Sequence, residues 1–519
     1  MTISSNQHAR LDKKKKDLLL FVFITLELSV GIVAFSNNLI IVFLAVGPSI
    51  ISFVSLRKKH VKKNKFRGAS TETKKRLPIF LFGAILTPIL LGMLFLVYDH
   101  DSYEPIGFMS LYFYALIFLT LVFAFMLTIF FIPLAIYNVE NRATPAFSGM
   151  RYPLLSIIVP AYNEQKNLGG TLESIIEADY ANKEIIVVDD GSTDNTYSIA
   201  FKHLGSLPLG RSSILRKSNG GKAGAINYGI RYARGEIIAV IDADCRIERL
   251  SLKEIVREFQ KTGVVAVAGG VKISNRINML TRCQALEYMI SINVHRRAFG
   301  SSGITLIVPG PLGAFSKKAL LERGLFDNNT STEDFDVTMK MLKSGGDVPE
   351  IIAQSYTRAP TSIRELYIQR DRWYNGAFQT LLKHRGVLTM PRYGILREFL
   401  FPIKMLSFLV FPFFDMLVVA STVVAIITGA WIFPFAWISL YLCWQILVSV
   451  ISIMLDGGRD WRLAIYAPFF VIGYRHFIDF IIIKSIFEVL FHVNGTRFEK
   501  KERQPSTMAV KSSPNKSRQ

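Results

Sequence analysis

The sequence predicts an α/β domain, with a mainly parallel sheet and helices on both faces, inserted between α-helical transmembrane segments. Half of the 519 residues are hydrophobic, yet the formal net charge is +21, so apolar and cationic residues must be segregated along the chain. Long apolar stretches flank a central region, residues 150–393, where short apolar runs alternate with helical patterns and with Gly, Asp and Asn. Such alternation is typical of a parallel sheet covered by helices.

Residues 1–140 are expected to form an N-terminal membrane region of about four transmembrane helices. Apolar stretches close to bilayer-crossing length occupy residues 18–35, 39–56, 78–98 and 111–137. The loop 57–76 is rich in Lys and Arg, which the positive-inside bias places in the cytoplasm. A basic run can also bind nucleic acid, but its position at the membrane edge favours a topology signal, so no nucleic-acid partner is expected. The central domain should therefore face the cytoplasm.

Residues 394–492 are expected to contain interfacial and transmembrane helices, and residues 493–519 a basic cytoplasmic tail without fixed structure. Three apolar stretches, 403–429, 431–455 and 463–491, would place the tail outside if each crossed the bilayer, whereas its Lys and Arg residues favour the inside. Either the first stretch breaks near Pro412 and Asp415, or the last is not a simple lipid-facing span, because it carries ionisable residues. These are Arg475, His476, Asp479, Lys484 and Glu488. We expect a multi-pass protein of the plasma membrane.

Three apolar runs of the central region lead directly into polar clusters. The runs are "LLSIIVPAYNE", "KEIIVVDDGSTDNT" and "GEIIAVIDADCRI", and Ser192 or Thr193 in the second could cap the helix that follows. Because ligands bind at the carboxyl ends of parallel strands, we expect the three clusters to meet at one edge of the sheet. Each cluster alone is also compatible with an ordinary loop.

"DAD" is the clearest of these clusters. On an extended segment, Asp242 and Asp244 would project to the same side and could hold a divalent cation. Hard oxygen ligands without histidine or thiol favour Mg²⁺ or Mn²⁺. Lys222 in "GGKAGA" is expected beside the same edge, where it suits a phosphate or is simply a solvated residue at a helix start. The first strand does not lead into a G-x-G-x-x-G turn, which disfavours a dinucleotide site.

Two further stretches carry candidate residues whose roles local reasoning leaves open. Gly310 and Pro311 in "VPGPLGAFSK" either let a ligand approach the backbone closely or turn the chain. Asp334 in "TED" is either a first-turn acid favoured by the helix dipole or a catalytic carboxylate.

"QRDRW" offers a potential binding platform. Helical spacing places Gln369, Arg372 and Trp373 on one face and directs Arg370 and Asp371 elsewhere. An aromatic plate beside an amide and a cation suits a sugar ring and a phosphate. An amphipathic helix at the membrane, with an interfacial tryptophan, explains the same pattern.

Taken in order, "VPAYNE", "DDGSTD", "GGKAGA", "DAD", "TED" and "QRDRW" resemble the processive family 2 glycosyltransferases, the cellulose, chitin, hyaluronan and poly-N-acetylglucosamine synthases. The resemblance covers the central domain and the membrane layout. It implies a GT-A type fold, a UDP-sugar donor, a growing polysaccharide as acceptor and a divalent metal.

The resemblance also implies roles for the residues of each motif. Those that would bind the nucleotide sugar are Ala161, Tyr162, Glu164, Asp189, Asp190, Lys222, Asp242 and Arg372. Asp244, with Asp242, would hold the metal, and Asp334 would be the catalytic base. Residues expected at the acceptor are Gly310, Pro311, Gln369 and Trp373.

The function expected from this resemblance is a membrane-embedded, inverting transfer of a sugar to a growing β-linked polysaccharide, which passes through the protein's own helices. "GPLGAFSK" looks like the acceptor region of synthases that use N-acetylglucosamine. Alternatives are a glucan synthase like those of cellulose, a non-processive transfer to a lipid acceptor, and a non-enzymatic polytopic transporter. The transporter would not need the intact set of carboxylates found here.

Overall fold

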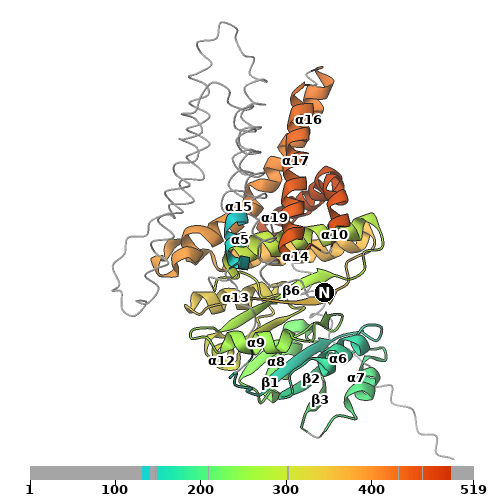
Figure 1. The fold of residues 1–519 in the computed structure, drawn as a ribbon, viewed down its shortest axis with the longest axis vertical. Helices are drawn as coiled ribbons and strands as arrows, with labels where there is room; N and C mark the ends of the chain where they lie inside the picture. Colours follow the sequence, from blue (N-terminus) through green and yellow to red (C-terminus); the bar gives the residue numbers. More distant parts are fainter. Residues whose placement is uncertain are drawn as a thin grey trace, which may run out of the picture. The chain divides into compact units, whose positions relative to one another are not determined.

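The computed structural model describes residues 131–140, 147, 149–208, 210–300, 303–429, 432–458 and 460–491. The expected apolar stretches 18–35, 39–56 and 78–98, residues 111–130 of the fourth stretch, and the basic tail 493–519 lie outside these residues. Within them, the central region is an α/β domain followed by a group of apolar helices (Figure 1).

Eight strands form one sheet in the order β3-β2-β1-β4-β7-β6-β8-β5. They are β1 (Leu155–Ala161), β2 (Lys183–Asp189), β3 (Ser212–Arg216), β4 (Ile237–Val240), β5 (Arg246–Ile247), β6 (Ala266–Ile273), β7 (Gly313–Ser316) and β8 (Glu350–Thr357). The strands β3, β2, β1 and β4 run parallel, as do β6 and β8. β7 is antiparallel to both β4 and β6, and β5 is antiparallel to β8. The sheet is therefore mixed but mostly parallel.

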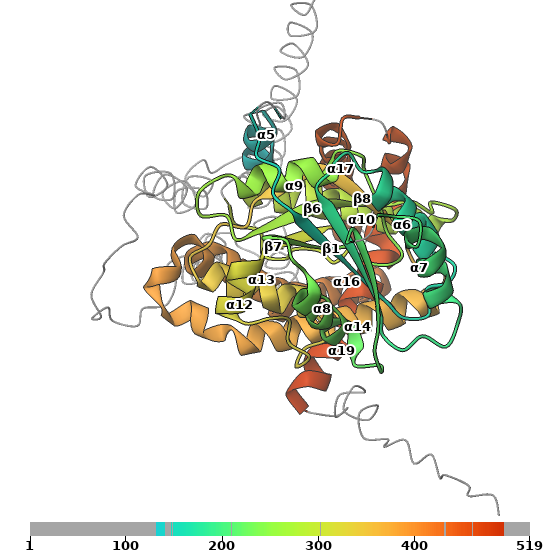
Figure 2. The same cartoon turned by 90° about the horizontal axis from the view of Figure 1, so that it is seen from below.

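Helices cover both faces of this sheet, as expected. They are α6 (Leu168–Glu177), α7 (Thr196–Leu204), α8 (Gly221–Tyr232), α9 (Ser251–Phe259), α12 (Lys317–Arg323) and α13 (Glu333–Lys343). Figure 2 shows α6, α7 and α9 on one side of the strands and α8, α12 and α13 on the other. The expected cap of α7 by Ser192 or Thr193 is wrong. Its N-cap residue is Asn195, because the side chain of Ser192 instead accepts a hydrogen bond from the N–H of Asn163.

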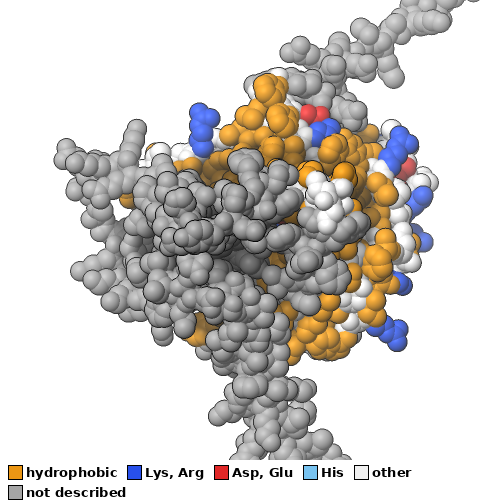
Figure 3. All heavy atoms as spheres, turned by 90° about the horizontal axis from the view of Figure 1, so that it is seen from above, with side chains coloured by type: hydrophobic (Ala, Val, Ile, Leu, Met, Phe, Trp, Pro, Cys, Tyr) orange, Lys and Arg blue, Asp and Glu red, His pale blue; other side chains and the backbone are white. Residues whose placement is uncertain are grey.

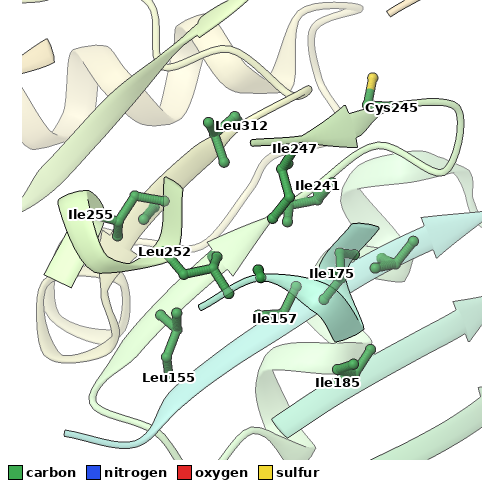
Figure 4. Packing of buried hydrophobic residues seen from close by; sticks show 14 of the residues in the cluster. Leu155, Ile157, Ile175, Ile185, Ile241, Cys245, Ile247, Leu252, Ile255 and Leu312 are labelled. Carbon is green, nitrogen blue, oxygen red and sulfur yellow. The ribbon is translucent and has the colours of Figure 1, made fainter. Parts of the chain in front are cut away.

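The main core lies between the sheet and the α6, α7 and α9 side. Figure 4 shows Ile157 and Ile185 of the sheet packed near Ile175 of α6 and Leu252 of α9, all of them buried. Alternate residues of the same strands face α8, where a Cβ atom on Gly229 would lie 2.8 Å from Ile158 Cγ2. Because both faces of β1 and β2 are covered by helices, these strands are apolar on both sides, which explains their continuous apolar runs.

Two longer helices lie between the strands and the apolar helices. They are α10 (Met279–Ile290), which packs on β6, and α14 (Ile363–Lys383), which carries "QRDRW" (Figure 1). The remaining helices are α5 (Ile132–Glu140), α11 (Arg297–Gly300), α15 (Phe401–Leu409), α16 (Phe411–Ile427), α17 (Ile432–Leu455), α18 (Ala467–Phe469) and α19 (His476–Phe491). α17 packs on α10, and α19 packs along both α14 and α16.

Among the described residues, the helical segment Leu396–Ile427 is long and apolar enough to cross a membrane by length and composition. Only 22% of its most apolar window is buried inside the protein, so it is not a core helix. Figure 3, seen from the end that carries α16, shows mainly hydrophobic side chains on the described part of this face, with Lys and Arg toward its edge.

The backbone of the C-terminal region is irregular at two places. The first C-terminal stretch is interrupted at Val410, between α15 and α16, and Pro412 stands in the first turn of α16. The last stretch has non-helical backbone at Ile472 and Gly473, where Gly473 has a φ of 102°. A positive φ strongly favours glycine, so the chain bends immediately before α19.

Gly235, which precedes β4, offers a test of the packing between the starts of β1 and β4. A Cβ atom there would lie 2.5 Å from the carbonyl oxygen of Leu154 and 2.8 Å from the backbone nitrogen of Ser156, so the backbone must move. We expect Gly235→Ala to reduce the free energy of unfolding by about 1–3 kcal/mol, visible as a lower melting temperature in detergent. A Cβ atom on Gly386 meets no described atom within 4 Å, so Gly386→Ala is the matched control and should melt like the parent protein.

Candidate active site

The loops after β1 and β2 are joined to each other by hydrogen bonds. The N–H of Asp190 donates to the carbonyl oxygen of Ala161 at 2.9 Å, and the N–H of Glu164 donates to Thr196 Oγ1 at 2.8 Å. The two parallel strands end in register, with Ala161 beside Asp189, so their polar loops necessarily meet at the same edge. The expected convergence of "PAYNE" and "DDGSTD" is present.

Asp189 and Asp190 both pair with cations from the end of β3. Arg216 Nε lies 3.2 Å from Asp189 Oδ2, and Lys217 Nζ lies 2.6 Å from Asp190 Oδ1. Asp190 Oδ1 also accepts from the N–H of Gly220, at 3.1 Å. Asp190 therefore holds the N-terminus of α8 against the edge formed by β1 and β2.

Tyr162 and Glu164 follow directly on β1 and differ in exposure. The Tyr162 side chain is 44% exposed, so its ring is accessible to a ligand. Glu164 accepts a hydrogen bond from Asn167 Nδ2 at 2.9 Å. Burial, with a smaller contribution from the charges of Asp244 and Asp242, raises the pKa of the Glu164 carboxyl. Glu164 is therefore electrostatically part of the same acidic site.

Asp242, Asp244 and Cys245 form a compact acidic turn. One potential ligand atom from each lies within 4.8 Å of the others. The expected extended segment is wrong, because β4 ends at Val240 and the N–H of Cys245 donates to the carbonyl oxygen of Asp242 at 3.1 Å, which closes a turn. Burial, and then the charge of Asp242, raise the pKa of Asp244. Two carboxylates crowded in this way suit a hard divalent cation, so the residues fit the expected metal.

Lys222 connects this acidic turn to the "TED" segment. Its Nζ atom lies 2.6 Å from Asp242 Oδ1 and 3.2 Å from Glu333 Oε1. Gly310 closes over this pair: its carbonyl oxygen accepts from the N–H of Asp242 at 3.2 Å, and a Cβ atom on it would lie 2.6 Å from Lys222 Nζ. Pro311 is half-buried in the following turn. Because residue 310 is a glycine, its backbone can lie directly against Asp242 and Lys222.

Asp334 stands in the first turn of α13, beside Glu333. Its Oδ1 atom accepts from the N–H of Phe335 at 2.8 Å. Burial, and then the charge of Glu333, raise the pKa of Asp334 to about 7, although Lys222 opposes the shift. A carboxyl group with a pKa near neutrality can accept a proton at physiological pH.

In α14, Trp373 is half-buried and Arg372 is exposed, while Gln369 is half-buried on the same face. The expectation that Arg370 points away from Trp373 is wrong. The Arg370 guanidinium lies 4.7 Å from the centre of the Trp373 ring, because residues three apart are neighbours on a helix.

α14 packs directly on the chain that leads into Asp334. A Cβ atom on Gly376 would lie 2.8 Å from the backbone nitrogen of Thr332, and Thr332 Oγ1 is 3.2 Å from Thr380 Oγ1. Gly376 is one helical turn from Trp373, so the tryptophan and the "TED" carboxylates belong to neighbouring parts of the structure.

This geometry defines a GT-A-like α/β domain with an acidic group at the carboxyl edge of its parallel strands that could hold a divalent cation. Residues 156–322 match the family model described as glycosyl transferase family 2. These residues therefore form a glycosyltransferase domain of family 2, which confirms the resemblance noted in the sequence at the level of that family.

Part of the chain is also similar to staphylococcal synthases. The chain is 31% identical over 231 residues to a poly-β-1,6-N-acetyl-D-glucosamine synthase of Staphylococcus epidermidis, a match that covers 44% of this chain and 56% of that protein. It is 29% identical over 235 residues to the protein of the same name from Staphylococcus aureus strain COL, with the same coverage. The chain thus spans about half the length of the curated relatives it matches.

A solved structure supports the fold. The mannosyltransferase PcManGT from Pyrobaculum calidifontis, in complex with GDP-Man and Mn²⁺, superposes with a TM-score of 0.54 at 20% identity. The match covers 74% of this chain and 100% of that one.

Some site residues escaped the sequence analysis. Glu333 lies inside "TED" but received no role, and Lys217 follows β3 in a stretch that resembles a solvated loop. Cys245 directly follows Asp244, and its thiol donates to Asp244 Oδ1 at 3.1 Å. Their positions next to recognised motifs were the available signals. What each side chain contacts depends on segments distant in sequence.

Asp244→Asn tests the acidic turn as a cation site. Removing one of two crowded carboxylates should weaken Mn²⁺ binding by at least about tenfold, because even the loss of an outer-shell partner costs 10–100-fold. Paramagnetic resonance of free Mn²⁺ measures this directly. Asp179→Asn, which removes an acid paired with Lys253, is the control and should bind Mn²⁺ normally. Unchanged affinity in Asp244→Asn would remove this residue from the metal site.

Proposed function

We propose that this protein is a membrane-embedded, inverting glycosyltransferase that polymerises UDP-N-acetylglucosamine into a β-linked polysaccharide and passes the product through its own helices. The proposal adds three statements to the family assignment: that the donor sugar is N-acetylglucosamine, that the enzyme adds it repeatedly to one chain, and that the product leaves through the protein's own helices. Similarity to the staphylococcal synthases supports the sugar and the polymer.

One observation supports the chemistry most strongly. Lys222 connects Asp242 of the acidic turn with Glu333, whose neighbour Asp334 has a pKa raised to about 7. Three segments far apart in the sequence thus supply a cation-binding acid, a fixed ammonium group and a carboxyl suited to proton transfer. An inverting sugar transfer from a nucleoside diphosphate sugar can use all three groups.

In the proposed reaction, Asp334 accepts the proton of the acceptor hydroxyl while that oxygen attacks the anomeric carbon. Positioned proton transfer of this kind contributes about 10²–10⁴-fold. Lys222 and Arg372 are assigned to the leaving diphosphate, and Trp373 to the sugar at the end of the acceptor. Mg²⁺ or Mn²⁺ held by Asp244 and Asp242 would add Lewis-acid stabilisation of the diphosphate.

The remaining assignments follow the motifs. Tyr162, with Ala161 and Glu164, and the pair Asp189 and Asp190 would hold the uridine. The exposed ring of Tyr162 and the anchored loop at Asp190 support this placement. Gln369, Gly310 and Pro311 are assigned to the acceptor.

The proposed layout has membrane helices in residues 1–140, a cytoplasmic catalytic domain in 150–393, interfacial and transmembrane helices in 394–492 and a basic tail in 493–519. The apolar segment Leu396–Ile427 supports the third of these regions. A polysaccharide is too polar to cross lipid, so a polymer made on the cytoplasmic side needs a polar conduit.

The decisive experiment incubates membranes that contain the protein with labelled UDP-N-acetylglucosamine, UDP-glucose or UDP-galactose and with Mg²⁺ or Mn²⁺. We expect a high-molecular-weight, hexosaminidase-sensitive product from the first donor only. Asp334→Asn should reduce its formation by at least about 10²-fold, with UDP binding retained. A short lipid-linked product would instead indicate non-processive transfer, and incorporation from UDP-glucose a glucan synthase.

The pKa of Asp334 predicts how the rate depends on pH. The base acts in its ionised form, so kcat should fall as the pH is lowered through about 7. Glu333→Gln removes the second cause of the raised pKa and should move this acid limb to lower pH. A rate that stays flat from pH 8 to pH 5 would exclude Asp334 as the base.

A further inference from the structure

A buried ionic cluster contacts the ring of Trp373 in α14. Arg370, which is 4% exposed, forms two parallel hydrogen bonds with Glu287 of α10: Nη1 to Oε1 at 3.1 Å and Nη2 to Oε2 at 2.5 Å. Tyr474 donates its hydroxyl to the same Glu287 Oε2 at 2.6 Å, and Arg370 Nη2 lies 3.4 Å from the Tyr474 oxygen. We call Glu287, Arg370, Tyr474 and the stacked Trp373 the Arg370 cluster.

The geometry of this cluster fixes the plane of the Arg370 guanidinium. A bidentate pair allows one orientation of guanidinium and carboxylate, and arginine stays charged even when buried. The Trp373 ring, 4.7 Å from the guanidinium carbon, is therefore held against a plate that cannot rotate. Without Glu287, Arg370 would be a buried cation without its carboxylate partner, which is strongly unfavourable.

Tyr474 connects the cluster to the bend before α19. It follows Gly473, whose φ is 102°, and it precedes Arg475, whose Nε atom lies 2.7 Å from Asp415 Oδ2 on α16. The start of α19 is thus tied to α10 and α14 by Tyr474 and to α16 by Arg475.

The cluster also lies within electrostatic range of the acidic turn. Burial raises the pKa of Tyr288, the neighbour of Glu287, and the charges that also act on this hydroxyl include both Arg370 and Asp244. Tyr288 therefore lies within electrostatic range of both Arg370 and Asp244. Together with the packing of Gly376 on Thr332, this brings the cluster close to both catalytic motifs.

We propose that Glu287 and Tyr474 are positioning residues for the acceptor: acting through Arg370, they hold the Trp373 ring in the orientation that retains the growing chain end between additions. This inference rests on the proposed function. It assigns control of product length to residues outside the recognised motifs, on α10 and at the start of α19.

The test measures product length and donor kinetics in Glu287→Gln and in Tyr474→Phe, which removes one hydroxyl and keeps the ring. We expect the mean polymer length to fall by about two- to thirtyfold, the range that corresponds to loss of an exposed or a desolvated cation–π contact. The KM for UDP-N-acetylglucosamine should change by less than about twofold, because the donor site is intact. Tyr474→Phe should show the smaller loss.

Two further variants separate positioning from folding. Asp460→Asn breaks an ion pair with Arg276, 2.8 Å away, outside the Arg370 cluster, and should leave the polymer length unchanged. The exchange Glu287→Arg with Arg370→Glu restores opposite charges but removes the guanidinium from Trp373. We expect this double variant to recover the melting temperature lost in Glu287→Gln but not the polymer length.

The outcomes are distinct from those that test the proposed function. If the parent protein makes no polymer from any UDP-sugar, the proposed function fails. If the parent makes polymer and both Glu287→Gln and Tyr474→Phe make polymer of the same length, the positioning role is wrong. If the exchanged variant makes polymer of the parent length, the positioning role is also wrong. The ion pair would then only stabilise the fold.

Discussion

The arrangement of the candidate active site depends on the position of one ammonium group. Lys222 lies at the start of α8, yet it contacts Asp242 after β4 and Glu333 at the start of α13. One ammonium group thus joins three segments that are far apart in the sequence. Asp190, by holding the N-terminus of α8 through Gly220, fixes where this lysine stands. Asp242 lies beside Asp244, and Glu333 lies beside Asp334. Without the positive charge of Lys222, repulsion among these carboxylates would push the loop after β4 away from the start of α13.

The part of this site that the sequence predicts is the part determined by short-range order. Parallel strands with apolar runs end at one edge, so "PAYNE", "DDGSTD" and "DAD" could be placed together from periodicity alone. The turn from Asp242 to Cys245 could not be predicted. The residues that directly follow the apolar run of β4 fit a continuing strand as well as they fit a turn. β7 has only four residues, Gly313–Ser316, and its antiparallel insertion between β4 and β6 leaves no local pattern.

Long-range ion pairs account for the other differences. Helical spacing grouped Gln369, Arg372 and Trp373 and left Arg370 aside, although a residue three positions before Trp373 is also its neighbour. The side chain of Arg370 is oriented by its hydrogen bonds to Glu287, which lies 83 residues earlier in the chain. Similarly, the ionisable residues in 463–491 indicated from the sequence that this stretch is not a simple lipid-facing span. In the structure, Lys484 lies 2.8 Å from Asp371 and Glu488 accepts from Asn375, so part of this charge joins α19 to α14.

The joining of α14 and α19 has a consequence for the environment of the enzyme. α14 contacts the chain before Asp334 on one side and is tied along the other to a helix that continues from the apolar C-terminal region. In the proposed membrane arrangement, bilayer thickness and lateral pressure would change the tilt of that region and, through α14, the geometry of sugar transfer. Lipid composition could then act on the rate of sugar transfer through the contacts between α19 and α14.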